Sequence, residues 1–185
     1  GGSQGAGLRL DGYNSGLIRL STNTFSGARY GLSIATQNAN AQIWLTSSTI
    51  IPSLSSAFDT YGLYINGLTS GATIQNNAIV WRQNGSQSGF TAYGLYAQSA
   101  SGLVIDHNRL NQPGLLTAGS FTGAYFSGAQ QSSFKFNDLN ANGVEFASHP
   151  QFTGIFKALY GDSALRRGPV GRTVMRAAGI SKSYT

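Results

Sequence analysis

The sequence of 185 residues contains no cysteine and few charged residues, and both absences narrow the range of functions. Without cysteine the chain has no disulfide, no thiol nucleophile and no cysteine-ligated metal site. Only 10% of the residues are charged, against about 25% in ordinary soluble domains. Abundant serine, threonine, asparagine and glutamine predict a neutral surface rich in hydroxyls and amides, as in many extracellular β proteins. We therefore expect an extracellular or cell-surface location.

Long hydrophobic runs are also absent. No apolar run reaches the roughly 18 residues of a membrane-spanning helix, so no span is expected. The printed sequence starts without methionine or a signal peptide, which is typical of a mature product or a fragment. The net charge of +6 is concentrated in residues 147–185, which hold six of the twelve basic residues and one acidic residue. Because the rest of the chain has no basic face, nucleic acid is not an expected partner.

A repeat runs through most of the sequence. An apolar residue, two variable positions, a polar corner residue, one variable position and a second apolar residue recur every 25 to 31 residues. The corner residues are Asn23, Ser48, Asn77, Asn108 and Asn137. A second element, glycine followed by an apolar residue, recurs between these copies, as in Gly62-Leu63 and Gly94-Leu95. A period of this length indicates a stack of identical supersecondary units.

The unit consists of short strands. Its apolar runs are too short for helices and are bounded by Gly, Ser and Asn. Apolar residues alternate within a run, as in Leu63 and Ile65 around Tyr64, so one face is buried and the other exposed. Stacked units of this kind pair each strand with its copies above and below. The sequence thus predicts an all-β, right-handed parallel β-helix of about five coils at about 4.8 Å per coil.

The repeat sets the expected domain boundaries. Residues 1–6 are expected to be a flexible lead-in, residues 7–146 the parallel β-helix, and residues 147–185 a basic C-terminal cap or tail that is helical in part. The corner asparagines Asn23, Asn77, Asn108 and Asn137 are predicted to form a structural ladder of stacked amides, with left-handed backbone at the corner. The glycine before each first strand is predicted to supply a positive φ at another corner.

The alternating glycine and asparagine elements resemble the repeat of the pectate-lyase-like superfamily of right-handed parallel β-helices. The resemblance covers about residues 7–146. It implies the fold, and it leaves the activity open, because that superfamily includes polysaccharide lyases, hydrolases, epimerases, tailspikes and adhesins. The resemblance also implies where chemistry would be sought: the lyases use a basic residue as proton acceptor, often with acidic calcium ligands.

Aligning the copies places three tyrosines, Tyr64, Tyr96 and Tyr125, at one outward position of successive coils. The same three coils carry the long connections between strands, and one of these holds Trp81 and Arg82. We expect the tyrosines to offer ring faces to sugars, with Trp81 and Arg82 at the rim. The alternative is that the tyrosines only stabilise the stack and the loop aromatics only pack the loops onto the rod.

A small charged cluster is the weak candidate for catalysis. The columns place Asp106 beside Lys135 and Arg109 beside Asp138, and two surface salt bridges are the simplest expectation. Asp106, Arg109 and Lys135 are the candidate catalytic residues of a polysaccharide lyase or hydrolase. The sequence has no dense set of carboxylates for calcium, and no metal or other cofactor is expected.

Taken together, these patterns favour a non-catalytic extracellular module, adhesive or structural, that contacts a polysaccharide, a surface glycan or a partner protein through the aromatic strip and loops. A polysaccharide-degrading enzyme is the first alternative. A fibre subunit that self-associates through its open coil ends is the second, because exposed strand edges invite pairing.

Overall fold

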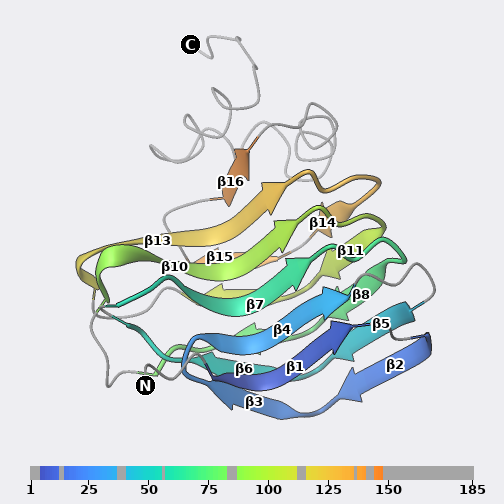
Figure 1. Ribbon diagram of the computed structural model, residues 1–185, viewed down its shortest axis with the longest axis horizontal. Coiled ribbons are helices and arrows are strands. Elements are labelled where there is room, and N and C mark those ends of the chain that lie inside the picture. Colours follow the sequence, from blue (N-terminus) through green and yellow to red (C-terminus); the bar gives the residue numbers. More distant parts are fainter. Residues whose placement is uncertain are drawn as a thin grey trace, which may run out of the picture.

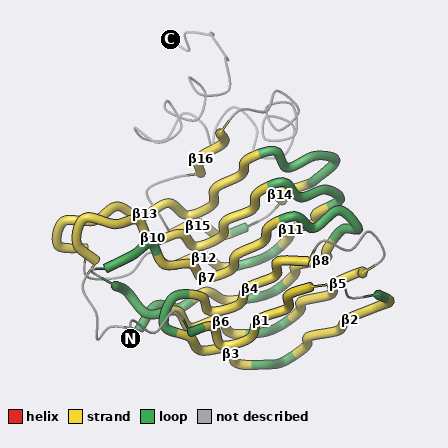
Figure 2. Tube along the Cα trace, viewed as in Figure 1, coloured by secondary structure: helices red, strands yellow, loops and turns green. Residues whose placement is uncertain are grey.

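The computed structural model describes residues 5–12, 15–36, 41–55, 57–82, 87–111, 116–135, 137–140 and 144–147. It is an all-β parallel solenoid, which confirms the predicted fold class (Figure 1). The tube drawing shows strands joined by short turns over the whole described part, with no helix (Figure 2). The predicted cap or tail, from residue 148 onward, lies outside the described residues, as do residues 1–4 of the predicted lead-in.

Three parallel sheets form the walls of the solenoid, and the chain visits them in turn. Sheet A contains six strands: β1 (Ala6–Gly12), β4 (Tyr30–Thr36), β7 (Thr60–Asn66), β10 (Gln87–Gln98), β13 (Leu116–Ser127) and β16 (Val144–Ala147). Sheet B contains five: β2 (Gly16–Ser21), β5 (Ala41–Thr46), β8 (Ala72–Gln75), β11 (Leu103–Asp106) and β14 (Ser133–Lys135). Sheet C contains five: β3 (Thr24–Gly27), β6 (Thr49–Pro52), β9 (Ala78–Ile79), β12 (Arg109–Asn111) and β15 (Asp138–Asn140).

The core lies inside the three walls and comes from the alternation seen in the sequence. Leu63 and Ile65 of β7 are buried and lie in register with Leu95 and Ala97 of β10. Sheet B contributes an equivalent buried column that includes Ile74. At the N-terminal turn the inward residues of β1 and β2 are only partly buried, namely Leu8, Leu10, Ile18 and Leu20. They have a neighbouring turn on one side only, since β1, β2 and β3 are edge strands.

Two of the long connections are partly strand, although the sequence suggested loops. The residues before Tyr93 and before Thr122 extend β10 and β13 to twelve residues each. The two extensions pair with each other, with register shifts near Ser88. In Figure 1 they project together beyond the body of the solenoid. The insertions on these coils therefore form a paired ribbon that continues sheet A.

Candidate functional site

The three predicted tyrosines form a stack on the outer face of sheet A. Tyr64, Tyr96 and Tyr125 are in register on β7, β10 and β13. Their ring centroids are 5.4 Å apart for Tyr64 and Tyr96 and 4.7 Å apart for Tyr96 and Tyr125. Both pairs are nearly parallel, with interplanar angles of 11°. The predicted column is confirmed, and we call these three residues the tyrosine strip.

A second tyrosine column lies against the tyrosine strip. Tyr30, Tyr61 and Tyr93 stack at 5.2 and 5.3 Å. Their rings also meet the strip edge to face, as for Tyr61 and Tyr64, whose centroids lie 5.1 Å apart at 68°. Each ring of the strip therefore contacts neighbours in two directions. Such contacts contribute about 0.5–1.5 kcal/mol per pair beyond burial, so they stabilise this arrangement of the rings.

The glycine column explains why both tyrosine columns share one face. A Cβ on Gly62 would approach the carbonyl oxygen of Gly94 and Cγ2 of Ile79, each at 2.5 Å. Position 62 thus points into the corner between sheets A and C, and the next residue, Leu63, is also buried. This break in alternation turns Tyr61 to the same side as Tyr64. The predicted positive φ is wrong here, because Gly62 is not among the positive-φ glycines and its role is steric.

The stacking determines which surfaces of the tyrosine strip, ring faces or hydroxyl-bearing edges, a ligand can contact. Neighbouring rings cover each other's faces, and hydroxyl-bearing edges take part in polar contacts beside the strip. The Tyr64 hydroxyl accepts a hydrogen bond from Asn66 Nδ2 at 3.2 Å, and the Tyr96 hydroxyl donates to Gln98 Oε1 at 3.2 Å. The expectation that ring faces lie open to sugars is therefore wrong for the stacked faces.

Burial within the cluster changes the acidity of the phenols. The pKa of Tyr96 rises to about 12, mainly because burial disfavours the phenolate and secondarily because Tyr125, Tyr64 and Tyr93 lie close. Burial likewise raises the pKa of Tyr61, with a further contribution from Asp59. Tyr61 and Tyr96 therefore stay neutral hydrogen-bonding groups throughout the physiological range of pH.

The two predicted rim residues behave differently from each other. Trp81 is only 4% exposed and packs edge to face on Phe121 at 5.9 Å, so the prediction of a rim position is wrong for Trp81. Arg82 is exposed, and its Nη2 donates to Oγ of Ser26, two turns away. For Trp81 and Phe121, packing of the loops onto the rod accounts for the aromatic side chains.

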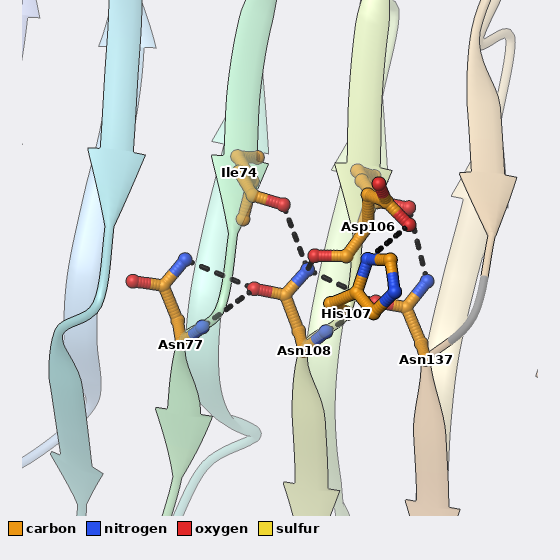
Figure 3. A network of polar contacts seen from close by, with 7 residues as sticks. Ile74, Asn77, Asp106, His107, Asn108 and Asn137 are labelled. Atoms are coloured by element: carbon orange, nitrogen blue, oxygen red, sulfur yellow. Dashed lines mark hydrogen bonds and ion pairs between the residues drawn. The ribbon is translucent and has the colours of Figure 1, made fainter.

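The predicted asparagine ladder is present for Asn77, Asn108 and Asn137 at the corner between sheets B and C, whereas the prediction is wrong for the side chain of Asn23 (Figure 3). Nδ2 of Asn77 donates to Oδ1 of Asn108 at 2.9 Å, and Nδ2 of Asn108 donates to Oδ1 of Asn137 at 2.9 Å. Ser48 replaces the amide at one rung, where its N–H donates to Oδ1 of Asn77 at 2.9 Å. At the N-terminal end, Asn23 is exposed, and its Nδ2 donates to the carbonyl of Ser21 at 3.0 Å in its own turn.

The left-handed backbone of this corner falls one residue earlier than predicted. Positive φ values occur at the residues that precede the ladder, namely Thr22, Ser47, Asn76 and His107. The ladder residue itself is then free to direct its side chain inward along the stack. The sequence pattern had assigned both the left-handed backbone and the ladder amide to one asparagine, whereas the structure places them on two consecutive residues.

The charged candidates lie just outside the ladder. Asp106 and Lys135 are register partners, as predicted, but no ion pair joins them among the described residues. Instead, Nδ1 of His107 lies 2.9 Å from Oδ1 of Asp106, because the left-handed backbone at His107 brings the imidazole back toward its neighbour (Figure 3). The predicted pairing of Arg109 with Asp138 is confirmed at 3.9 Å between exposed side chains.

Within the described ranges, no group of three or more His, Asp or Glu side chains converges on a point where a metal could be held. The same part of the chain contains no helix that is long and apolar enough to cross a membrane. The candidate catalytic residues are thus a short polar row across adjacent strands of sheets B and C.

One exposed aromatic residue was missed by the sequence reasoning. Trp44 of β5 is 42% exposed on the outer face of sheet B, between the buried residues Ile43 and Leu45. The alternation of β5 was sufficient to place its side chain outward. Its significance depends on neighbours from other turns, which a single strand does not reveal.

Comparisons with family models, with curated proteins and with solved structures found no significant match to this chain. The assignment of the fold therefore rests on the strand order and the register of this chain. Every strand pair in the described sheets is parallel, and the sheets take their strands in rotation. The protein is an all-β parallel solenoid.

Proposed function

We propose that the chain is a non-catalytic extracellular module, adhesive or structural, that contacts a partner protein through the outer face of sheet A. The observation that carries the proposal is the interlocked cluster formed by the tyrosine strip and the second column, Tyr30, Tyr61 and Tyr93. Tyrosine combines an apolar ring with a polar tip, and it is enriched at protein interfaces for this reason.

Two features favour protein over glycan as the partner of this face. Sugar rings stack on open aromatic faces, whereas the faces within the tyrosine strip are stacked on one another at 4.7 and 5.4 Å. A protein interface needs rigid apolar area with hydroxyls at its edge, because immobilising side chains costs about 0.5–1.5 kcal/mol each. Side chains already fixed by stacking avoid much of that cost.

We also propose a superfamily, a handedness of winding and a cellular location for the chain. The glycine and asparagine elements support membership in the pectate-lyase-like superfamily, and parallel crossover connections favour right-handed winding in about 98% of cases. The low content of charge and the abundance of serine, threonine, asparagine and glutamine support an extracellular or cell-surface location.

A polysaccharide-degrading enzyme remains the second candidate because of one contact. Nδ1 of His107 lies 2.9 Å from Oδ1 of Asp106, and Lys135 is the register partner of Asp106 on the next strand. A carboxylate that orients an imidazole is a common arrangement for a general base. His107 is 58% exposed on a corner, which is also what a simple surface contact requires.

The decisive variant removes the hydroxyls of the tyrosine strip without removing its rings. The wild-type chain and the triple variant Tyr64→Phe, Tyr96→Phe, Tyr125→Phe are passed over immobilised panels of secreted proteins and of polysaccharides. Released reducing and unsaturated ends are recorded in parallel. We expect retention of the wild type on at least one protein, loss of retention in the triple variant, and no released sugar.

Circular dichroism and thermal melting serve as the control for folding of the triple variant. Equal retention of both chains would refute a role for the strip hydroxyls. Retention on no protein would remove the adhesive function for this face. Release of sugar ends by the wild type but not by Asp106→Asn would establish the enzymatic alternative.

A further inference from the structure

A groove on the outer face of sheet B lies apart from the tyrosine strip. It has a volume of about 260 Å³, and its lining includes Gln42, Trp44, Ser70, Gly71, Thr73 and Gly102. Drug-sized ligands occupy pockets of roughly 300–1,000 Å³, so this groove suits a smaller unit such as one sugar ring. Its lining comes from three successive turns of the solenoid. The groove is thus built by the stack and belongs to no single strand.

Trp44 provides one wall of the groove, and Arg19 makes a cation–π contact with its ring. The Cζ atom of Arg19 lies 4.8 Å from the centroid of the Trp44 ring. Arg19 comes from β2, whereas Thr73 on the groove side comes from β8, and β5 lies between these strands in sheet B. Arg19 and the groove therefore lie on opposite sides of Trp44. A cation over an aromatic ring is attractive, so the contact with Arg19 favours this orientation of the indole.

The other walls supply polar groups without charge. Gln42 brings an amide, and Ser70 and Thr73 bring hydroxyls. The Ser70 hydroxyl donates to the carbonyl of Ala41 across the turns. No described lining residue is ionisable. Gly71 and Gly102, with φ values of 88° and 68°, also line the groove, and because they have no side chains they do not project into it.

We propose that this groove binds one pyranose ring of a neutral oligosaccharide. The apolar face of the ring would stack on the groove side of Trp44, and its hydroxyls would exchange hydrogen bonds with Gln42 and Thr73. An aromatic wall with a few placed polar groups is the usual composition of a small-molecule site. The absence of ionisable lining residues selects neutral over anionic sugars, because a carboxylate or sulfate would be desolvated there without a partner.

The test uses the full chain and soluble neutral polysaccharides built from glucose, mannose or galactose, with binding measured by affinity electrophoresis. Trp44→Ala is the primary variant, and Val104→Ala is its matched control. Val104 is 40% exposed, lies one strand beyond Thr73 in the same outward column, and does not line the groove. We expect at least one polysaccharide to bind the wild type and Val104→Ala equally. Trp44→Ala should weaken that binding by about tenfold or more.

Further measurements test whether the ligand is neutral and whether it binds at Trp44. Binding should persist when salt is raised, and it should survive in the triple phenylalanine variant of the tyrosine strip, which separates this site from the proposed function of sheet A. Tryptophan fluorescence should respond to the polysaccharide in the wild type and lose that response in Trp44→Phe. Absence of binding to every neutral polysaccharide would overturn the proposal, as would unchanged affinity in Trp44→Ala. A preference for anionic polysaccharides that Arg19→Gln abolishes would overturn it as well.

Discussion

The backbone N–H and the side-chain amide of Asn77 both donate to a single oxygen, Oδ1 of Asn108, at 3.0 and 2.9 Å. The same pair of bonds links Asn108 to Asn137, at 2.8 and 2.9 Å. Each buried amide also returns a bond to a strand carbonyl, as Asn108 does to Ile74 at 2.7 Å. One side chain thus satisfies several buried groups of neighbouring turns, where few other partners are available.

Removing one rung of the ladder should therefore be costly. Asn108→Ala removes the acceptor of the Asn77 N–H and of one Nδ2 hydrogen of Asn77, and it removes a donor from the carbonyl of Ile74, all in a buried corner. Each unsatisfied buried group costs about 1–3 kcal/mol, so we expect a loss of about 3 kcal/mol or more in the free energy of unfolding. The control is Asn23→Ala at the exposed end, where a loss below about 1 kcal/mol is expected. Chemical denaturation measures both, and equal losses would contradict a special role for the buried amides.

The glycine column gives a steric prediction. Gly62→Ala introduces a Cβ that would lie 2.5 Å from the carbonyl oxygen of Gly94, which is backbone and cannot move aside cheaply. Overpacking of this kind costs about 1–3 kcal/mol, occasionally more. Gly5→Ala is the matched control, because a Cβ there has no neighbour within 4 Å. Thermal melting should separate the two variants, and an unchanged melting temperature for Gly62→Ala would show that the turns can move apart.

Much of this fold follows from one-dimensional pattern. The alternation of Leu63 and Ile65 fixed the inward face, and the spacing of Asn77, Asn108 and Asn137 fixed a corner, because a solenoid places each repeat directly on the last. The pattern could not reveal which residue of that corner adopts the left-handed backbone and which one supplies the ladder amide. The left-handed backbone at His107 and the inward amide of Asn108 were both assigned to asparagine, since both properties suit that residue.

The candidate sites were harder to predict, because they depend on the angles between rings and on contacts between turns. The outward position of Tyr64 and Tyr96 was correct, yet only their interplanar angle of 11° shows that the ring faces are covered. Trp81 lies on a connection, and its burial against Phe121 needs a partner forty positions away. The groove at Trp44 likewise requires Gly71 and Gly102 from later turns.

Alkaline pH should destabilise the fold through the tyrosine cluster. An unfolded tyrosine has a pKa of about 10, and the folded environment raises that of Tyr96 to about 12. Because the folded state holds the proton more tightly, this contribution is fully present below about pH 10 and is lost as pH rises toward about 12. Phenolate absorbance and denaturation midpoints would follow both events. In Tyr96→Phe the alkaline fall should be smaller, whereas identical curves for the two chains would contradict this assignment.

The serine rung offers the opposite experiment, a substitution that should stabilise the protein. Ser48 is buried in the ladder, its Oγ accepts the N–H of Asn23 at 3.2 Å, and it donates to the carbonyl of Thr46. In Ser48→Asn the longer side chain would place its oxygen nearer to that N–H, and its amide could donate to Oδ1 of Asn77. One added buried hydrogen bond contributes about 0.5–1.5 kcal/mol, so the midpoint of unfolding should rise. Ser48→Ala should lower it, because the N–H of Asn23 loses its acceptor. If Ser48→Asn instead destabilises the chain, the corner at this rung is too narrow for an amide, and the serine is required by its size.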